Sequence, residues 1–463
     1  MGLSFGSINT GLPKDIVKQL IEAEKLPLVR LEQRKSKFAN KQSLVGELIQ
    51  LVEDIRGNLA LNANARSLRE LKVHTDESIV DVTVDKNTAL PGSHQIEVVQ
   101  LAQKSSAMTS GFSDPKDSYV GVGYIQYTLP DGSTKEIYVD AENSSLDGIE
   151  KLINSDNGNG VNANVVNDGK EGVDNWKLIL SLTETGESNK AEFPYFYFVD
   201  GEDDFYLEFQ REAQNAIVKV DGFEIQLPDN KTNDIIKGAT IDLKKAKPGE
   251  EFSIKITEDQ QKITTKILDL VDKINGALNF IKKQNTLDES SDTSKTLGGD
   301  LILQTLESRI RAAVFHNVQT ANGTRRVGDI GITFKRDGLL SFDDKKFENS
   351  VKKDFNSTAQ VLTGWISPEG IKTEGFMGKL NTVIGEALKH PSGLLKARNR
   401  SLQSNIDQID RRIANKSRLI EQKEKNLKQK FARLESTISQ IRNQGAGLAA
   451  LGNSGPDPVQ QLG

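Results

Sequence analysis

Apolar residues recur at seven-residue spacing near both ends of this chain. Near the start, six of them share one grid, which only Glu24 interrupts: Val17, Leu31, Phe38, Val45, Val52 and Leu59. Near the end, the same period runs without a break: Ile406, Ile413, Ile420, Leu427, Leu434 and Ile441. An apolar residue at every seventh position forms a narrow stripe that a lone helix cannot bury. Each end is therefore predicted to be a helix that needs a partner, either the other end or another copy of the chain.

The first of these helices is predicted to start near Lys14 and to reach about residue 71, with a bend or a restart at Pro27. The last is predicted to start after Pro391 and to end near residue 443, before a disordered tail. The first twelve residues are also expected to be disordered. Three lysines occupy the second apolar position of the last helix: Lys416, Lys423 and Lys430. Lysines there weaken a coiled coil and can specify its partner or register. We therefore expect 1–40 with 416–463 to form a terminal coiled-coil leg that is flexible in isolation.

The middle of the chain alternates apolar and polar residues at period two, which is typical of strands with one buried face. Turn signals such as Asp131-Gly132 and Asp221-Gly222 separate these segments. The strands are predicted at 78–84, 94–99, 124–128, 136–139, 176–182, 195–199, 216–220, 223–227, 240–243 and 252–256. We expect two antiparallel domains, a β-rich head of 73–112 with 211–258 and an inserted outer head of 113–210.

Helical periodicity returns at about Asp259, with a broad stripe that is wider than a coiled-coil seam. Its members are Ile263, Ile267, Leu270, Val271, Ile274, Leu278 and Ile281. Helices at 300–314 and 375–389 and a hairpin of 330–334 with 338–342 complete a helical leg domain of 41–72 with 259–415. The fold class predicted is α+β and multi-domain: a coiled-coil leg from both termini, a helical domain with a small β hairpin, and two antiparallel β-rich head domains.

Composition favours an assembly protein over a membrane protein or a metal enzyme. Among 463 residues, 36% are hydrophobic and the mean hydropathy is −0.47, as expected when long helices bury one stripe only. No stretch is apolar enough to span a membrane, and the start lacks a secretion signal. The protein therefore either stays in the cytoplasm or leaves by a route without a cleaved signal. Zero cysteines and four scattered histidines exclude disulfides, thiolate metal sites and a histidine cluster.

Charge is distributed unevenly along the chain. Residues 396–442 contain 13 basic and five acidic residues, whereas 114–204 contain six basic and 19 acidic ones. A basic helix can bind nucleic acid. Here the basic residues alternate with the apolar stripe and with Glu421, Glu424 and Glu435, so a solvated coiled-coil face is favoured over nucleic acid. The acidic middle also argues against binding a phosphate backbone.

No segment carries a recognisable catalytic, cofactor or metal motif. The stretch 154–160 resembles a calcium loop but lacks the residues required at positions five and six, so a turn is expected. The carboxylates of 200–204 are expected in a solvated loop. Trp176, Trp365 and the aromatic run 195–198 are expected in the core. We therefore predict a protein that is not an enzyme and holds no cofactor.

Several segments, in order along nearly the whole chain, resemble the flagellar hook-associated protein 2 family of filament caps. At the start the family pattern is matched by Gly11, Leu12, Asp15, Val17, Leu20, Ile21, Glu24 and Pro27. Further matches are 95–103, 152–154, 160–163, 181–186, 220–222, 236–240, 298–300, 337–343 and 431–435. The departures are Pro13, where a small residue is common, and the Gly- and Pro-containing end.

The resemblance implies a ring of copies at the tip of the growing filament, which promotes the insertion and polymerisation of exported flagellin and is needed for motility. The partners it implies are further copies of the chain, flagellin, hook–filament junction proteins and a flagellar export chaperone. It implies export through the flagellar secretion apparatus to the extracellular filament tip. The alternative from another class is a surface adhesin that uses the acidic outer head.

Overall fold

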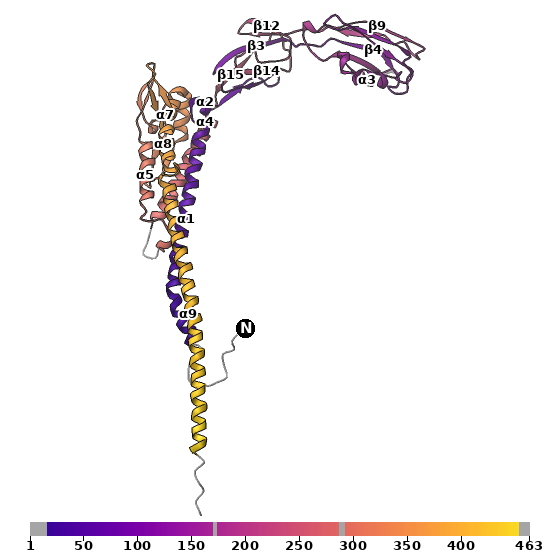
Figure 1. The fold of residues 1–463 in the computed structure, drawn as a ribbon. Helices are drawn as coiled ribbons and strands as arrows, with labels where there is room; N and C mark the ends of the chain where they lie inside the picture. The colour runs from indigo at the N-terminus through magenta and orange to yellow at the C-terminus, as the bar shows by residue number, and fades with distance from the viewer. Residues whose placement is uncertain (1–15, 170–173, 287–291, 453–463) are drawn as a thin grey trace, which may run out of the picture. The chain divides into compact units, whose positions relative to one another are not determined.

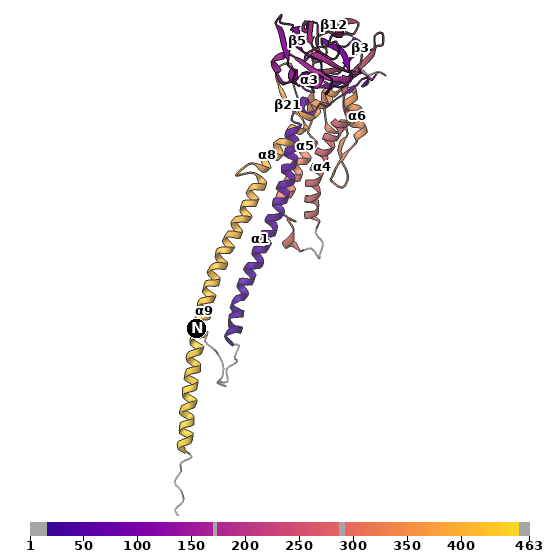
Figure 2. The ribbon, with the colours of Figure 1, turned by 90° about the vertical axis from the view of Figure 1, so that its right-hand side faces the viewer.

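The computed structural model describes residues 16–169, 174–286 and 292–452, and these form two compact units (Figure 1, Figure 2). The helical unit comprises the described residues within 1–63, 266–347 and 356–463. The β-rich unit comprises those within 64–265 and 348–355. Both ends of the chain therefore belong to one unit, and most of the middle belongs to the other.

Long helices make up most of the helical unit: α1 (Ile16–Leu61), α4 (Gln260–Asn285), α5 (Leu301–Val314), α8 (Phe376–Leu388) and α9 (Leu394–Gly452). Both views show α1 beside α9, and α8 packs against α1, α5 and α9 (Figure 1, Figure 2). Small elements complete it: η3 (Thr293–Lys295), β16 (Val318–Thr320), β17 (Gly323–Arg325), η4 (Val327–Ile330), β18 (Ile332–Phe334), β19 (Leu340–Phe342), α7 (Phe355–Thr363), β20 (Gly364–Ile366) and β21 (Lys372–Glu374). The helix α6 (Asp344–Lys353) begins in this unit, and its residues from 348 onward belong to the β-rich unit.

Most of the predicted helices of this unit are confirmed. The seven residues of the α4 stripe are all buried, α5 and α8 lie within two residues of their expected bounds, and β18 pairs with β19 as the expected hairpin. The restart at Pro27 is wrong, because α1 continues through this residue. A proline inside a helix costs about 3 kcal/mol, because it removes one backbone hydrogen bond and its ring clashes with the preceding turn; packing of α1 on α9 can offset this cost. Expected disorder at 1–12 and after residue 452 lies outside the described residues.

The two long terminal helices end elsewhere than predicted. α1 stops at Leu61, not near 71, because asparagine side chains satisfy the backbone there: Asn62 Nδ2 donates to the Asn58 carbonyl at 3.1 Å, and Asn64 Oδ1 accepts from Ser67 N at 2.9 Å to cap α2 (Ala65–Leu68). α9 continues to Gly452, past the expected end near 443. The glycines from 445 onward lower helix propensity but do not stop the helix.

Two antiparallel sheets enclose the first core of the β-rich unit, named here the β3 core. One has the order β1 (Leu71–His74), β15 (Phe252–Glu258), β3 (Gly92–Gln100), β11 (Ala216–Val220) and β12 (Phe223–Leu227); the other has β13 (Lys231–Thr232), β14 (Ala239–Leu243) and β2 (Val80–Val84). At the β11–β12 turn, Asp221 and Gly222 have φ of 50° and 87°, the two positive values that a type I′ hairpin requires. The strand signals placed in these sheets are confirmed.

A second core, named the α3 core, lies between β3 and β11 in the sequence. Its sheets have the orders β10 (Leu207–Arg211), β4 (Ser106–Phe112), β8 (Trp176–Leu182), β7 (Val161–Asn167) and β6 (Thr134–Val139), β5 (Val122–Thr128), β9 (Glu192–Val199). α3 (Leu146–Ser155) packs beside β7, and η1 (Asn157–Asn159) and η2 (Glu187–Asn189) are short turns. β4 pairs with β8 and β10 and so belongs to the α3 core. The proposed boundary at residue 113 comes after β4 in the sequence and would wrongly assign this strand to the other head domain. The division of the head into two domains otherwise stays a proposal.

Candidate assembly site

The two ends of the chain form one antiparallel pair of helices. Four contacts join α1 to α9: Glu24 with Lys423 at 2.7 Å, Lys35 with Asp410 at 2.7 Å, Gln42 with Gln403 at 2.7 Å, and Glu53 with Lys396 at 3.0 Å. As the residue number rises along α1, it falls along α9. The partner helix that each heptad stripe requires is therefore the other end of the same chain.

The twelve predicted stripe residues differ in how deeply this seam buries them. Those buried are Val45, Val52, Leu59, Ile406 and Ile420. Those half-buried are Val17, Leu31, Phe38, Ile413 and Leu427. Leu434 and Ile441 are exposed, at 50% and 61%. The seam is thus best covered where α8 also contacts α1 and α9, and least covered beyond the start of α1.

A second seven-residue grid on α9 explains why coverage falls. It begins with Leu395, Leu402 and Ile409, which are all buried. It continues with the three lysines that the sequence singled out, Lys416, Lys423 and Lys430. The seam therefore changes from two apolar rows to one apolar row and one charged row as it approaches the start of α1. The buried residues of the first half were missed, although the same spacing predicts them.

Glu24, which interrupts the apolar grid of α1, contacts Lys423, one of the three lysines on the second grid of α9. Glu24 is the single polar residue on the N-terminal grid, and its Oε1 accepts a hydrogen bond from Lys423 Nζ at 2.7 Å. That hydrogen bond, with the charges of Lys423 and Lys416, lowers the pKa of the Glu24 carboxyl. A charged pair at a seam position can specify the register of a coiled coil. Here it disfavours shifts of less than one heptad, since Lys416 and Lys430 flank Lys423 at seven-residue spacing. This contact cannot be predicted from either pattern alone.

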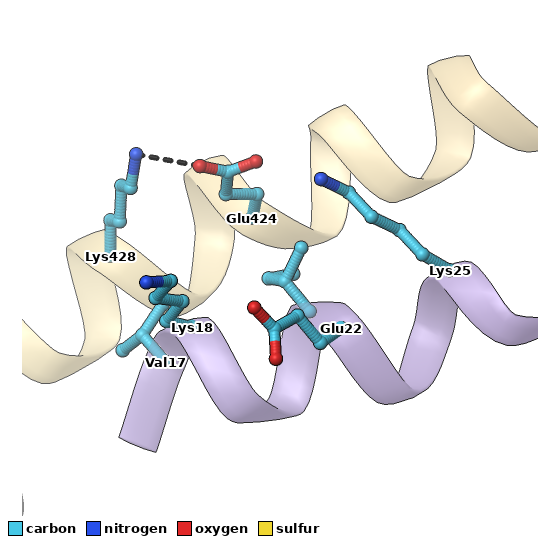
Figure 3. Close-up of a pocket in the computed structure, with 7 residues that line it drawn as sticks. Val17, Lys18, Glu22, Lys25, Glu424 and Lys428 are labelled. Carbon is cyan, nitrogen blue, oxygen red and sulfur yellow. Dashed lines mark ion pairs between the residues drawn. The ribbon is translucent and has the colours of Figure 1, made fainter. Parts of the chain in front are cut away.

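A groove opens between α1 and α9 near the start of α1 (Figure 3). It has a volume of about 380 Å³ and is lined by Val17, Lys18, Ile21, Glu22, Lys25, Glu424 and Lys428. Figure 3 shows the four labelled α1 residues facing Glu424 and Lys428 of α9, which form an ion pair at 2.7 Å. Lys428, and to a smaller extent Lys25, lower the pKa of the Glu424 carboxyl. An apolar floor with charges of both signs can bind a polypeptide but offers no reactive group.

α9 continues past the beginning of the described part of α1 (Figure 1). The register of Glu24 with Lys423 places Ile16 opposite about residue 431 of α9. The stripe residues beyond that point, Leu434 and Ile441, have no α1 residue opposite them within the described range. An exposed apolar stripe on a helix can pack against another helix.

The other sequence candidates supply no chemistry. No group of His, Asp and Glu side chains among the described residues could hold a metal ion. In the 154–160 turn, Asp156 Oδ1 accepts from Gly158 N at 2.8 Å and caps η1. Trp176, Phe196 and Phe198 pack against the α3 core as expected. Tyr195 and Tyr197 do not, since both are exposed. None of the described helices is both long and apolar enough to cross a membrane.

Two family models match this chain. The flagellar hook-associated protein 2 N-terminus matches residues 11–105, and the flagellar hook-associated protein 2 C-terminus matches residues 213–443. Together they cover more than two thirds of the chain and include both helices of the seam. The chain belongs to the flagellar hook-associated protein 2 family.

Relatives agree with this membership. The A-type flagellar hook-associated protein 2 of Pseudomonas aeruginosa is 26% identical over 99% of both chains. The crystal structure of the D1-D2-D3 domains of the flagellar cap protein FliD from Escherichia coli is 21% identical, with a TM-score of 0.54, and the match covers 78% of this chain and 99% of that one. The flagellar cap protein FliD from Bdellovibrio bacteriovorus is 47% identical over 39% of this chain and 99% of that one, with a TM-score of 0.36.

Membership of the hook-associated protein 2 family agrees with the predicted α+β multi-domain fold. The likeness to the Escherichia coli cap extends over most of the chain, so the similarity is one of whole architecture and not of a single motif. The segment between the two family models, 106–212, corresponds closely to the α3 core. The matched segments thus contain most of the helical unit and the strands of the β3 core.

Proposed function

We propose that this protein caps the flagellar filament as a ring of copies at its tip, where it promotes the insertion of flagellin. The observation that carries the proposal is the seam of α1 and α9, which joins the two family-matched ends into one leg. A leg whose apolar stripe continues beyond its own partner can dock on the protein beneath it. Among residues 16–61 and 394–452 of the leg, no side chains form a catalytic arrangement or a metal-binding group, and the proposed role is structural.

The same surface of the leg suggests which proteins it binds. The uncovered stripe of Leu434 and Ile441 and the groove at Val17 fit helical segments of flagellin or of a hook–filament junction protein. An export chaperone could cover the same stripe before assembly, because a stripe of this kind is a liability in a free chain. Export through the flagellar apparatus to the filament tip is part of this proposal. None of the three relatives named above is described as an adhesin.

The proposal keeps the leg flexible in the isolated protein, over 1–40 and 416–463. The motivation is the charged row of Lys416, Lys423 and Lys430, which halves the apolar width of the seam there. Limited proteolysis of the free protein should trim residues before about 40 and after about 415 and leave the rest intact. Full resistance of both ends in a monomer contradicts this.

The decisive experiment places charge in the seam. In the double variant Ile413→Asp with Ile420→Asp, two carboxylates enter positions that are half-buried and buried. An unpaired buried carboxylate is strongly unfavourable, so the leg should not form. In cells that express only this variant, we expect secreted, unpolymerised flagellin and no swimming, while the β-rich unit stays folded.

The control changes charge in the other unit, the β-rich one. Replacing Glu202, Asp203 and Asp204 by their amides alters three residues of a loop, of which none has an ion pair among the described residues. Swimming should be unchanged. If the loop variant stops filament growth and the seam variant does not, the leg is not the working part and the proposal fails.

A further inference from the structure

One face of the β6-β5-β9 sheet carries four tyrosines. Tyr138 of β6, Tyr124 of β5 and Tyr197 of β9 lie directly opposite one another across the three strands. Tyr195 of β9 is two residues from Tyr197, so it points to the same side, opposite Gln126. Their exposed fractions are between 41% and 52%. These four residues are named the tyrosine face.

The tyrosine face is not a displaced part of the core. Phe196 and Phe198 alternate with its tyrosines along β9 and point the other way, where both rings contact Phe205 at 5.4 and 4.7 Å between centroids. A buried tyrosine of the same sheet behaves differently: Tyr127 donates its hydroxyl to the Asn159 carbonyl at 2.7 Å. The hydroxyls of the four face tyrosines make no hydrogen bond to another residue in the described part of the chain.

Sheet stability accounts for only part of this arrangement. Tyr124 and Tyr138 are a cross-strand pair with centroids 5.0 Å apart, a contact that stabilises paired strands. Tyr195 and Tyr197 lie on one strand, with parallel rings 5.9 Å apart, and so join no strands together. A solvated sheet face is usually polar. Tyrosine gathered on such a face is instead typical of protein interfaces, because it supplies a large rigid surface at low entropic cost.

The charges around the tyrosine face are negative. Glu136 lies opposite Gln126, and Glu192 opposite Thr128, so both carboxylates share the face. Residues 114–204 contain 19 acidic and six basic residues. Two of those bases are already engaged: Lys177 with Asp168 and Glu208, and Lys190 with Glu187 and Glu212.

We propose that the tyrosine face binds a lysine- or arginine-bearing polypeptide segment. The faces of aromatic rings attract cations, and the carboxylates of Glu136 and Glu192 add to the same preference. A neutral sugar could stack on the rings and donate hydroxyl hydrogen bonds to the carboxylates, but it would gain no charge attraction, and an anionic chain would be repelled. The ring pairs and the charge together select a basic protein surface. This binding is separate from the role of the leg.

Binding of fluorescent penta-arginine to the full-length protein, followed by anisotropy, tests the proposal. The double variant Tyr124→Leu with Tyr197→Leu keeps apolar side chains but removes two ring faces. We expect about 5- to 30-fold weaker binding, which is the loss of two exposed cation–π contacts. Glu136→Gln with Glu192→Gln should also weaken binding. Raising the salt from about 50 mM to about 500 mM should weaken the wild-type complex, because it shortens the screening length.

Tyr206→Leu is the matched control, since Tyr206 is 56% exposed in the same unit but lies outside this sheet; binding should not change. Equal binding by the double tyrosine variant would show that carboxylates alone attract the peptide and would overturn the proposal. So would a complete lack of binding by the wild-type protein, or tyrosine-dependent binding of neutral maltohexaose in place of penta-arginine.

Discussion

The seam of α1 and α9 and the α3 core bury apolar side chains in opposite ways. In the α3 core, sheets and a helix enclose the side chains, so that Phe112, Ile125 and Leu146 are fully buried. In the seam, each helix covers one stripe of the other, and Val17 and Leu427 stay half-exposed. An enclosed core depends on many neighbours close in sequence, whereas the seam depends on two segments from opposite ends of the chain. The core should therefore resist conditions that open the seam.

The largest effect is expected in the α3 core. Phe112→Ala removes a fully buried ring that contacts Phe205 at 6.0 Å between centroids. Such a truncation costs about 3–5 kcal/mol, because a cavity remains. Trp176 packs against this core, so its fluorescence in a Trp365→Phe background reports unfolding of this core by urea. Phe209→Ala, at a ring that is 57% exposed, should shift the midpoint hardly at all. Equal shifts for both would show that the core is not closed.

The next effect separates the covered and uncovered halves of the seam. Ile420 is 4% exposed and Leu434 is 50% exposed, on the same heptad grid. Ile420→Ala should weaken the leg by about 2–4 kcal/mol. Because the wild-type leg is proposed to be flexible from residue 416, the readout is a further loss of helical circular dichroism and a higher rate of α9 cleavage than in the wild type. Leu434→Ala should leave the isolated protein unchanged but reduce swimming, because this stripe has no partner within the described chain. Similar loss of helix in both variants would mean that the stripe is covered throughout.

These two regions were not equally predictable from sequence. Period-two alternation and Asp-Gly turns located β5, β8, β11 and β12, because these strands bury one face only. β4 and β7 were missed. β4 is rich in small residues, and β7 alternates asparagine with small apolar residues, so neither shows a strong apolar period.

The sequence also did not predict specific side-chain contacts. Asn154 of α3 bonds the backbone of Ala163 through both its amide atoms, and Glu24 meets Lys423 across nearly the whole chain. Heptad spacing predicts that a partner helix exists, but it does not give the register between the ends. Tyr195 and Tyr197 were expected in the core because aromatic residues usually are. Their alternation with Phe196 and Phe198 was the signal that two of the four point outward.

A smaller effect compares a buried and an exposed lysine of the β-rich unit. The Lys177 side chain is 6% exposed and pairs with Asp168 at 3.3 Å and with Glu208. Hydrogen bonds to Glu208 and Asp168 raise the pKa of Lys177 above its usual value. Lys177→Met leaves two carboxylates without their cation and should cost about 1–3 kcal/mol in urea unfolding. Lys190→Met, at a lysine that is 46% exposed, should cost much less. The reverse order would contradict the enclosure of this core.

The smallest effect is a pH dependence of the seam. The pKa of Glu24 is lowered in the folded protein, chiefly by the hydrogen bond from Lys423. The pair therefore contributes stability above the unfolded pKa of 4.5, and this is lost as the pH falls through the lower folded value. Proteolysis of α9 by pepsin should accelerate over that range. In the Glu24→Gln variant the same fall in pH should accelerate cleavage less, since the amide does not take up a proton. The same pH response in both would assign it to other groups.

The pairing of α1 with α9 also determines when the leg can exist. Its two helices begin and end the described chain, so the contact closes a loop of nearly the full length, the slowest kind of contact to form. During synthesis the N-terminal helix emerges first, and its apolar stripe stays unpaired until the C-terminal helix has been made. The β3 and α3 cores need no such wait, because their strands lie within 71–258. The leg can therefore form only when both helices are present, and a copy truncated before α9 would have folded sheets but no paired leg.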